Sequence, residues 1–401
     1  MSPESRVALV NNSRETFTPT VSGAIATCLW ELLRTPEGTR RVDRVVTRGT
    51  TAPSYPTPLV RVVRPRPLPF AGRRAGRALR RVSGWAHADQ ASFARLVSAE
   101  LRRDPPEVAV CSNDPEVAVH LARALPGVRV VHWFHNLEVA DDRWRRAYAS
   151  VHGSRVRTVA VSAYLARAVE QVYRLSPGSV DVARNGVDTA RFAPRAADDA
   201  PGADDVPTVA HLGRVAVEKG LDVFLDAAGI LHRRGVRVRV LVIGDTNWGF
   251  SDGGPFGEAV ADRVRALRAA GLEVETSGHV PRADLPPVLR RADVQVLASR
   301  WDEPCALTVL EGLATGLPLV ASATGGTPEL VGDAGVLVPR ESPSELAAAL
   351  EPLLADAGRR AALGASARRR AETFTWSRTW SALVDARPSA PAAPDPDPDP
   401  A

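Results

Sequence analysis

Short apolar runs alternate with longer amphipathic stretches along most of the chain. The runs are rich in valine and predict buried strands, whereas apolar residues that recur at helical spacing predict helices. In the first half, strands are predicted over residues 6–10, 42–47, 59–63, 107–111, 128–133 and 158–161, and helices over 21–33 and 163–173. Strands that alternate with helices predict a parallel sheet covered on both faces.

The same rhythm returns in the second half of the chain, after a break. Residues 193–207 are rich in alanine, aspartate and proline and lack periodicity, so they predict a linker. Further strands are predicted over residues 208–212, 238–244, 272–276, 294–297, 319–322 and 335–338. We therefore expect an α/β protein of two facing Rossmann-like domains, 1–192 and 208–375, with ligands bound in an interdomain cleft at strand carboxyl ends.

The end of the chain differs from both domains. A helix over residues 376–386 is expected to pack back towards the first domain. The proline- and aspartate-rich tail, 387–401, cannot bury a core and is expected to be disordered.

Composition agrees with a globular protein of two domains. The length of 401 residues is large for one core, and 44% apolar with 24% charged residues is ordinary. The three cysteines, Cys28, Cys111 and Cys305, are widely spaced and predict reduced thiols, not disulfides or a zinc site. We expect neither a signal peptide nor a membrane span, which needs ~18 apolar residues, and hence a cytoplasmic protein.

The basic residues are unusually biased. The net charge of +5 suits an acidic ligand such as a phosphate, although solvated surface charge explains it as well. Of 51 lysines and arginines only Lys219 is a lysine. Because the composition otherwise favours arginine, Lys219 marks a position where a compact ammonium group is needed, unless chance spared it.

Two cations follow the first predicted strand of the second domain. Gly213 lies at the end of that strand, and Arg214 and Lys219 lie on the loop that leads into the next helix. Such a loop can direct both cations at one diphosphate. The alternative is a pair of solvated charges on an ordinary strand-to-helix loop.

A second candidate segment is 301–312. Pro304 is a favourable first residue of a helix, so the amides of Cys305 to Thr308 are expected to face an anion, assisted by the helix dipole. Glu303 and Glu311 would then lie roughly 10 Å apart at ~1.5 Å per residue. This span suits a sugar nucleotide, with the sugar at Glu303, the phosphates at the helix start and the ribose at Glu311. Most glutamate pairs at this spacing are solvated, and that alternative stays open.

These motifs together resemble family 4 of the retaining glycosyltransferases, which have the GT-B fold. The second half carries LGRVAVEKG, GHV, DEPCALTVLEGLATGLPLV and GGTPELV in the family's order. The first half is similar more loosely, through Ser22-Gly23 in a glycine turn, His135 in FHNLE, Ser162 in VSAYL, and Asn185 and Asp188 in NGVDTARFAP. Gly325, Gly326 and Glu329 match the family's turn after a strand, and His132 is expected to be structural.

The resemblance implies roles for individual residues. Arg214 and Lys219 would bind the donor diphosphate, Glu311 the ribose, Glu303 the donor sugar, and Val280 the base through backbone groups. The implied donor site comprises Gly23, Gly213, Arg214, Lys219, Val280, Glu303, Cys305, Ala306, Leu307, Thr308 and Glu311. His135, Glu303, Arg214 and Lys219 would be catalytic, and His135 with Glu138 would contact the acceptor.

The chain departs from the family at two places. Cys305-Ala306 stands where the family commonly has Phe-Gly, which adds a methyl group near the sugar and leaves the donor sugar open. The loop 246–257 is long and carries Trp248, Phe250 and Phe256. It could cover the donor, but a surface loop without a role in binding is the favoured interpretation.

The resemblance implies a mechanism without a protein nucleophile. The acceptor's proton would pass to the leaving diphosphate oxygen while Arg214, Lys219 and the helix N-terminus stabilise the charge, and His135 would position a hydroxyl. A hexose from a nucleotide diphosphate, UDP-sugar foremost, is the expected donor. Outside the proline- and aspartate-rich tail, no Asp-x-Asp donor motif is evident, so we expect no required cofactor and no metal.

The acceptor is left between two classes. Glu138, Asp141 and Asp142 would suit a cationic small molecule such as an aminoglycoside precursor, although helix-start acids explain them equally. The basic segment 64–85, with Arg73, Arg74, Arg77, Arg80 and Arg81, would suit an anionic membrane and a lipid or cell-surface glycan, but a solvated helix is favoured.

Other function classes are weaker. A GT-B epimerase and a non-catalytic sugar-nucleotide binder stay open, and the presence of both Glu303 and His135 favours an enzyme. Nucleic-acid binding is disfavoured because aromatic residues are not interleaved with the basic stretch. Dinucleotide binding is disfavoured because no G-x-G-x-x-G motif follows a predicted strand. The sequence makes no prediction of oligomeric state.

Overall fold

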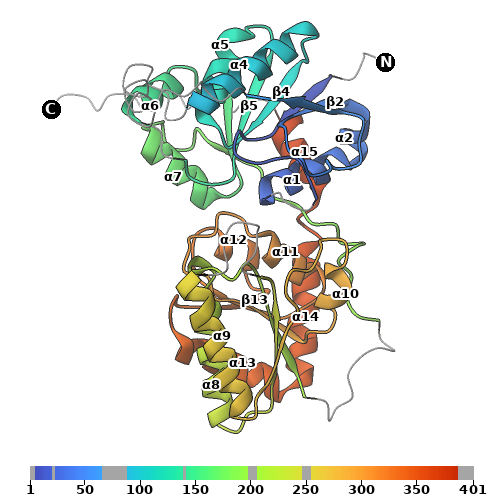
Figure 1. Cartoon of the computed structure of the whole chain (residues 1–401), viewed down its shortest axis with the longest axis vertical. Helices are drawn as coiled ribbons and strands as arrows, with labels where there is room; N and C mark the ends of the chain where they lie inside the picture. The colour runs from blue at the N-terminus through green and yellow to red at the C-terminus, as the bar shows by residue number, and fades with distance from the viewer. Residues whose placement is uncertain are drawn as a thin grey trace, which may run out of the picture. The chain divides into compact units, whose positions relative to one another are not determined.

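The computed structural model describes residues 5–19, 23–65, 88–138, 141–196, 206–245 and 254–386. By packing, the chain divides into two compact units (Figure 1). The first comprises Met1–Ala183 together with Thr379–Ala401, and the second comprises Arg184–Arg378.

The first unit is built on a seven-stranded sheet in the order β3-β2-β1-β4-β5-β6-β7, with every pair parallel. Its strands are β1 (Val7–Val10), β2 (Val42–Arg48), β3 (Val60–Val63), β4 (Val108–Ser112), β5 (Arg129–Phe134), β6 (Val156–Ala160) and β7 (Asp181–Val182). Its helices are α1 (Ala24–Leu33), α2 (Pro36–Arg41), α4 (Ala88–Arg103), α5 (Pro115–Ala124), α6 (Asp142–Ala149) and α7 (Ala163–Tyr173).

The second unit is built on a six-stranded parallel sheet in the order β10-β9-β8-β11-β12-β13. Its strands are β8 (Thr208–Leu212), β9 (Arg239–Ile243), β10 (Glu273–Thr276), β11 (Val294–Leu297), β12 (Leu319–Ser322) and β13 (Gly335–Val338). Its helices are α8 (Leu221–Arg233), α9 (Gly254–Ala269), α10 (Leu285–Leu289), α11 (Leu307–Ala314), α12 (Thr327–Val331), α13 (Pro343–Ala355) and α14 (Ala357–Ala371). A helix α15 (Trp376–Trp380) and a π-helical turn, Ser381–Asp385, follow.

The valine-rich runs form strands because both faces of each sheet are covered. In the second unit, α8, α9 and α13 pack together along one face (Figure 1), and their apolar residues share one buried core with Val209, Val240 and Val296 of the sheet. In the first unit, β1 is buried at all four positions. This is the pattern of parallel strands between two helical layers.

The strand orders place a topological switch point in each sheet. In the first unit the chain moves to opposite sides after β1 and β4, and in the second unit after β8 and β11. In doubly wound sheets, ligands bind beside such a point, at the carboxyl ends of the strands. A ligand site is therefore expected at the loops that follow these four strands.

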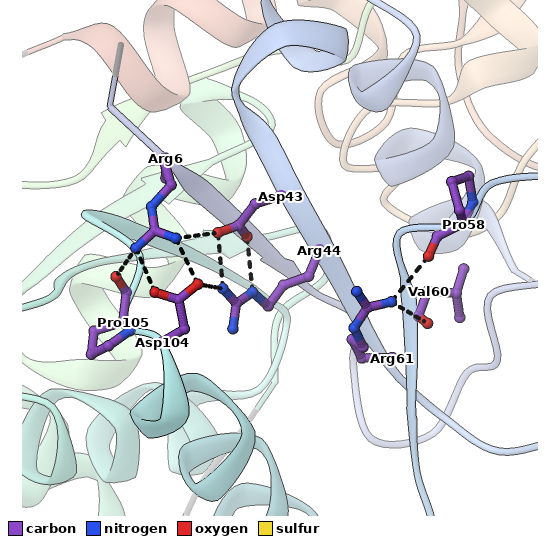
Figure 2. Close-up of polar contacts among 8 residues, drawn as sticks. All are labelled: Arg6, Asp43, Arg44, Pro58, Val60, Arg61, Asp104 and Pro105. Atoms are coloured by element: carbon purple, nitrogen blue, oxygen red, sulfur yellow. Dashed lines mark hydrogen bonds and ion pairs between the residues drawn. The ribbon is translucent and has the colours of Figure 1, made fainter. Parts of the chain in front are cut away.

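An ion-pair network lies at the amino-terminal ends of β1, β2 and β4 in the first sheet (Figure 2). Arg6, just before β1, donates to Asp104 at 2.6 and 2.8 Å and to the Pro105 carbonyl at 2.9 Å. Arg44, on β2, donates to Asp43 at 2.9 Å through two nitrogens and to Asp104 at 3.1 Å. The Arg6 hydrogen bond lowers the pKa of Asp104 to about 2. These groups lie at or near the amino ends of β1, β2 and β4, so they brace the sheet at the end opposite to the loops where ligands are expected.

Most predicted strands agree with the structure, and the boundary between the units differs from the prediction. The units divide after Ala183, whereas the linker was predicted at 193–207. The intervening segment packs on the second unit: Arg184 bonds Glu329 at 2.8 Å, and the Val187 amide donates to the Phe374 carbonyl at 2.8 Å. The packing therefore changes before the alanine-, aspartate- and proline-rich composition begins.

The C-terminal turn packs with the first unit. Arg157 donates to the Leu383 and Ala382 carbonyls at 2.9 Å each, and Arg129 donates to the Val384 carbonyl at 2.6 Å. These arginines fix the ends of the π-helical turn, whose carbonyls would otherwise lack partners.

Several predicted features lie outside the described residues: Ser22, Trp248, Phe250, Arg73, Arg74, Arg77, Arg80, Arg81 and the tail 387–401. Phe256, placed by the prediction in a long loop, belongs to α9 and packs against the core of the second unit. Among the described residues, no helix has the length and apolar character needed to cross a membrane.

Candidate functional site

The switch point of the second unit carries a direct ion pair. Lys219 ends a 3₁₀ turn, Val217–Lys219, after β8, and Glu303 lies on the loop after β11. Lys219 Nζ lies 2.5 Å from Glu303 Oε1, and the Glu303 side chain is 7% exposed. The fold therefore places Lys219 and Glu303, which were predicted from separate motifs, in direct contact.

The loop after β8 turns sharply because Gly220 adopts a left-handed conformation, with φ of +64°. A Cβ at Gly220 would lie 1.9 Å from the Ala298 carbonyl oxygen, so only glycine allows the two loops to approach this closely. This contact sets Lys219 next to the loop that holds Glu303.

Arg214, the second predicted cation, has a different partner. Its Nη2 lies 2.9 Å from Glu218 Oε1, and both side chains are well exposed. The Glu218 carbonyl accepts from the amides of Arg300 and Trp301 at 2.9 and 3.2 Å, which ties the β8 loop to the β11 loop. Arg214 and Lys219 therefore pair with different carboxylates.

Glu303 is held by its neighbours as well as by Lys219. Ser299 Oγ lies 2.9 Å from Glu303 Oε1, and the Gly326 amide donates to the Glu303 carbonyl at 2.8 Å. Gly325, with φ of +56°, lies directly against this loop, because a Cβ there would be 2.5 Å from the Glu303 carbonyl oxygen. The turn after β12 thus fixes the backbone that presents Glu303.

The predicted helix start at Pro304 is wrong. Helix α11 begins at Leu307, and Ala306 at its N-cap is extended, with φ of −66° and ψ of 119°. Cys305 precedes the helix, and its carbonyl accepts a hydrogen bond from Asn185 Nδ2 at 2.9 Å. The amides at the helix start are therefore those of Leu307 and Thr308, preceded by Ala306. All three residues are half-buried, at the surface of the unit.

Glu311 lies in the middle of α11 and is almost fully buried, with its side chain 2% exposed. Its carboxylate pairs with Arg282, whose guanidinium stacks on Phe192 at 5.7 Å. Val280 is half-buried on the loop after β10. Nearby, the Gly278 carbonyl accepts from the Gly244 amide at 3.0 Å, which joins that loop to the end of β9.

The cysteine that departs from the family pattern is inert. Cys305 is buried, and burial raises the pKa of its thiol to about 12. Its contribution to the site comes through its backbone.

The switch point of the first unit gathers a polar cluster around Asn113, which follows β4. Asn113 Oδ1 accepts from the amides of His135 and Asn136 at 2.8 Å each, and Nδ2 donates to Glu138 Oε1 at 3.1 Å. Arg14, after β1, also bonds Glu138 Oε1, at 3.0 Å. Asn113 has φ of +51°, a conformation that asparagine tolerates better than most residues. Three loops are thereby fixed around His135.

His135 is buried and packs against Trp133, with ring centroids 4.1 Å apart and the rings tilted by 56°. Burial lowers its pKa to about 3, so the imidazole is neutral. Within the described part of the chain, its Nε2 is buried without a hydrogen-bond partner. His132 lies on β5, with Nδ1 2.8 Å from the Tyr148 hydroxyl, as expected of a structural residue.

The sequence analysis missed Asp114. Its carboxylate accepts from the Ser13 amide at 2.5 Å and from Gln90 Nε2 at 3.1 Å. Burial raises its pKa to about 6. A signal existed: the polar runs Asn11-Asn12-Ser13 and Ser112-Asn113-Asp114 each follow a buried strand, and neighbouring parallel strands bring such ends together.

Gly23, predicted to lie over a phosphate, caps the N-terminus of α1 and contacts Glu15. The Glu15 carboxylate accepts from the Ala26 amide at 3.3 Å, and burial raises its pKa. A Cβ on Gly23 would lie 2.4 Å from Glu15 Oε1. The Glu15 carboxylate therefore lies beside Gly23, at the N-terminus of α1.

The remaining predicted residues have local roles. Ser162 caps α7 by accepting from the Leu165 amide at 3.2 Å, and Asp141 caps α6 by accepting from the Trp144 amide at 2.9 Å. Asp188 accepts from the amides of Ala190 and Arg191. Within the described residues, no group of three or more His, Cys, Asp or Glu side chains is arranged to hold a metal ion.

Two family models match the chain. The model for group 1 glycosyl transferases covers residues 206–356, and the model for Glycosyltransferase Family 4 covers residues 40–191. The two matches fall on the second and the first unit.

Curated relatives agree with these models. A D-inositol 3-phosphate glycosyltransferase of Saccharomonospora viridis is 32% identical over 300 residues, covering 68% of this chain and 67% of the relative. One from Salinispora tropica is 35% identical over 230 residues, covering 53% and 46%. Spore coat protein SA of Bacillus subtilis is 25% identical, covering 75% and 83%. The chain spans about half the length of three such D-inositol 3-phosphate glycosyltransferases, that of Salinispora tropica among them (46%, 54% and 52%).

Solved structures share the whole fold. A glycosyltransferase from Rickettsia africae superposes with a TM-score of 0.71 at 16% identity, over 96% of this chain and 100% of the other. HepE from Anabaena, in complex with UDP and glucose, gives 0.69 at 18% identity, over 95% and 99%.

Proposed function

The chain belongs to glycosyltransferase family 4 and has the GT-B fold, and from this premise we propose that it transfers a hexose from a nucleotide diphosphate to an acceptor hydroxyl. The observation that carries the proposal is the Lys219–Glu303 pair at the switch point of the second unit. A cation for phosphate and a carboxylate for sugar hydroxyls stand side by side there, next to the start of α11.

The donor follows from the chemistry of these groups. Lys219 and Arg214 supply positive charge for a diphosphate, and the amides of Ala306, Leu307 and Thr308 add hydrogen-bond donors assisted by the helix dipole. Glu311 is the acceptor for ribose hydroxyls. Because Arg282 already pairs with Glu311, the ribose would share that carboxylate with it. HepE, a structural neighbour, is described in complex with UDP and glucose, which supports a UDP-sugar here.

The ion pairs imply a rearrangement on binding. Lys219 pairs with Glu303, and Arg214 pairs with Glu218. We propose that the diphosphate replaces these carboxylates as partner of both cations and frees Glu303 to bind the sugar. The cations then stabilise the leaving group as charge develops.

For transfer, we propose retention of configuration without a protein nucleophile. The acceptor's proton passes to the leaving diphosphate oxygen. His135 is neutral because of its burial, so it acts by hydrogen bonding to a hydroxyl and not as an acid. Retention can be read by proton NMR during slow hydrolysis of UDP-α-glucose: α-glucose should form first, and β-glucose first would contradict this step.

The acceptor is proposed as a small polar molecule held by the cluster around Asn113. Glu138, which shares its Oε1 between Arg14 and Asn113, offers a carboxylate for a hydroxyl or an amine. An aminoglycoside precursor fits this chemistry. The inositol phosphate named for the curated relatives is the other candidate.

The experiment is thermal unfolding with UDP, dTDP, GDP and ADP, each with and without EDTA. A ligand at about 100 times its dissociation constant stabilises the native state by about 2.7 kcal/mol. We expect a clear rise in melting temperature with UDP that EDTA does not alter. Absence of a shift with all four nucleotides would refute the donor site, and loss of the shift in EDTA would refute metal independence.

A further inference from the structure

We propose that Asn185 is a positioning residue that orients the peptide between Cys305 and Ala306 so that the Ala306 amide faces the donor diphosphate. The inference rests on the proposed function, because it concerns the same donor site. Asn185 itself does not touch the donor. It acts through the backbone of the loop that precedes α11.

The contact is direct and buried. Asn185 Nδ2 donates to the Cys305 carbonyl oxygen at 2.9 Å, and Asn185 is 4% exposed. Rotation of this buried peptide would break the bond and leave the carbonyl and the Asn185 amide without a hydrogen-bond partner, away from water. The free-energy cost of this loss holds the peptide in one orientation.

Peptide geometry transmits this contact to the next residue. The peptide bonds of the described chain are all trans, and in a trans peptide the carbonyl and the following N–H point in opposite directions. The Cys305 carbonyl points at Asn185, so the Ala306 N–H points away from it. Within the described residues, no hydrogen bond engages that N–H.

The same bond explains why α11 starts where it does. Ala306 is extended, and the helix begins only at Leu307. The Cys305 carbonyl is directed at Asn185, and the first helical hydrogen bond, from the Leu310 amide, goes instead to the Ala306 carbonyl at 3.4 Å. The Ala306 amide is consequently placed ahead of the free amides of the first helical turn, which extends the row of donors available to an anion.

The segment that carries Asn185 is itself anchored on both sides. Arg184 bonds Glu329 at 2.8 Å, and the Val187 amide bonds the Phe374 carbonyl at 2.8 Å. Gly186 lies so close to the following connection that a Cβ there would be 2.5 Å from the Trp376 nitrogen. Because the segment is anchored, the Asn185 side chain is held in place and can preorganise the loop before α11.

The residue type matters. Asparagine donates through a neutral amide, whereas aspartate has nearly the same shape but cannot donate when ionised, and it would face the Cys305 carbonyl with negative charge. Asn185→Asp therefore removes the orientation without leaving a cavity, and Asn185→Ala removes it without adding charge.

The experiment compares binding of UDP and of uridine by calorimetry in the wild type, Asn185→Ala and Asn185→Asp. Uridine lacks phosphates, so a group that acts through the diphosphate affects only UDP. Loss of one hydrogen bond to a charged ligand should weaken UDP binding by roughly tenfold. Asp188→Ala is the matched control, because Asp188 caps a turn in the same segment without contacting the donor loop.

The expected result is weaker UDP binding in both Asn185 variants with uridine binding unchanged, and wild-type ratios in Asp188→Ala. Equal UDP affinity in all four proteins, or a parallel loss of UDP and uridine binding, would overturn the role of Asn185. If the wild type bound neither ligand, the proposed function itself would fall. Should Asn185→Ala fail to fold, the isosteric Asn185→Asp gives the same comparison.

Discussion

At the scale of single residues, the charged groups proposed to bind the donor already have partners within the protein. Lys219 with Glu303, Arg214 with Glu218, and Arg282 with Glu311 are each paired. Unpaired charges at a half-buried site would be costly, and resident carboxylates offset that cost until a ligand arrives. No spacing in the sequence predicts the Lys219–Glu303 pair, because the two residues are 84 positions apart.

The lone lysine gives the first prediction. Lys219→Ala should weaken UDP binding by about tenfold or more, because it removes a phosphate cation. Lys219→Arg should restore it only in part, since a planar guanidinium does not fit a point-charge site. Calorimetry measures both.

Arg263→Ala is the control for net charge, because Arg263 pairs with Asp226 on the exposed surface of α8 and α9. Full UDP affinity in Lys219→Ala would contradict the assignment of Lys219. So would an equal loss in Arg263→Ala.

Asp114 gives a prediction about pH. Burial raises its pKa to about 6 in the folded protein, above an ordinary value of 3.8. Because the folded state then holds the proton more tightly, stability should fall as the pH rises from about 4 to about 6, by an amount on the order of 2 kcal/mol. Asp114→Asn should lack this loss. Urea unfolding of both proteins at pH 4 and pH 7 measures it, and an identical pH dependence in the two would contradict it.

At the scale of elements, the strands were predictable and the loops were not. The predictions for β8, β11, β12 and β13 agree to the residue, because buried parallel strands are near-continuous apolar runs. The two-residue strand β7, Asp181–Val182, was missed, since an edge strand of that length has no periodicity to detect.

The start of α11 shows where local signals fail. Pro304 favours a helix start, yet the helix begins at Leu307. The competing influence is the hydrogen bond from Asn185, which comes from a distant part of the sequence. Asn113 and Asp114 were missed for a related reason: each polar run looks ordinary by itself, and Asp114 lies beside Ser13 because β1 and β4 are neighbours in the sheet.

The turn after β12 gives a prediction at this scale. Gly325→Ala should destabilise the second unit by roughly 1–3 kcal/mol and weaken UDP binding, because it adds left-handed strain and pushes the Glu303 loop. Gly235→Ala is the matched control, as Gly235 has φ of +75° and open space around its Cβ position. It should lose some stability and keep UDP binding. Equal UDP affinities in both variants would show that the Gly325 turn does not position the loop.

Glu303 separates binding from turnover. Glu303→Ala should lower the rate of donor hydrolysis more than it lowers UDP affinity, because its proposed ligand is the sugar and not the diphosphate. Steady-state kinetics with UDP-glucose measures this, with calorimetry on UDP beside it. An unchanged rate in Glu303→Ala would remove Glu303 from the site.

At the scale of the whole molecule, both units share one response to acid. Burial lowers the pKa of His132 and His135 to about 3 in the first unit, and that of His211 to about 4 in the second. The unfolded chain binds these protons near pH 6.5 and the folded protein does not, so stability should fall as the pH drops from about 6.5 towards 4. Asp114 opposes this trend in the first unit.

Unfolding monitored at pH 7.5, 5.5 and 4.5 tests the acid response. His211→Gln should reduce it in the second unit and leave the first unit unchanged. Stability that is constant over this range would contradict the neutral state of the buried histidines, and with it the role given to His135 as a neutral hydrogen-bonding group.

The groups proposed to bind the donor and those proposed to bind the acceptor lie in different units. The second unit carries the donor groups at the ends of β8 and β11, and the first carries the polar cluster at the ends of β1 and β4. Both sites lie at switch points that the strand order alone identifies. The family membership, shown by relatives and family models, is consistent with this use of the fold.

The most direct test of the central claim is a crystal structure of the protein with bound UDP. We predict diphosphate oxygens within about 3 Å of Lys219 Nζ and of the amides of Ala306 to Thr308, with ribose hydroxyls on Glu311 and the Lys219–Glu303 contact broken. UDP bound away from the β8 and β11 loops, or a diphosphate that leaves the Lys219–Glu303 pair intact, would contradict the account.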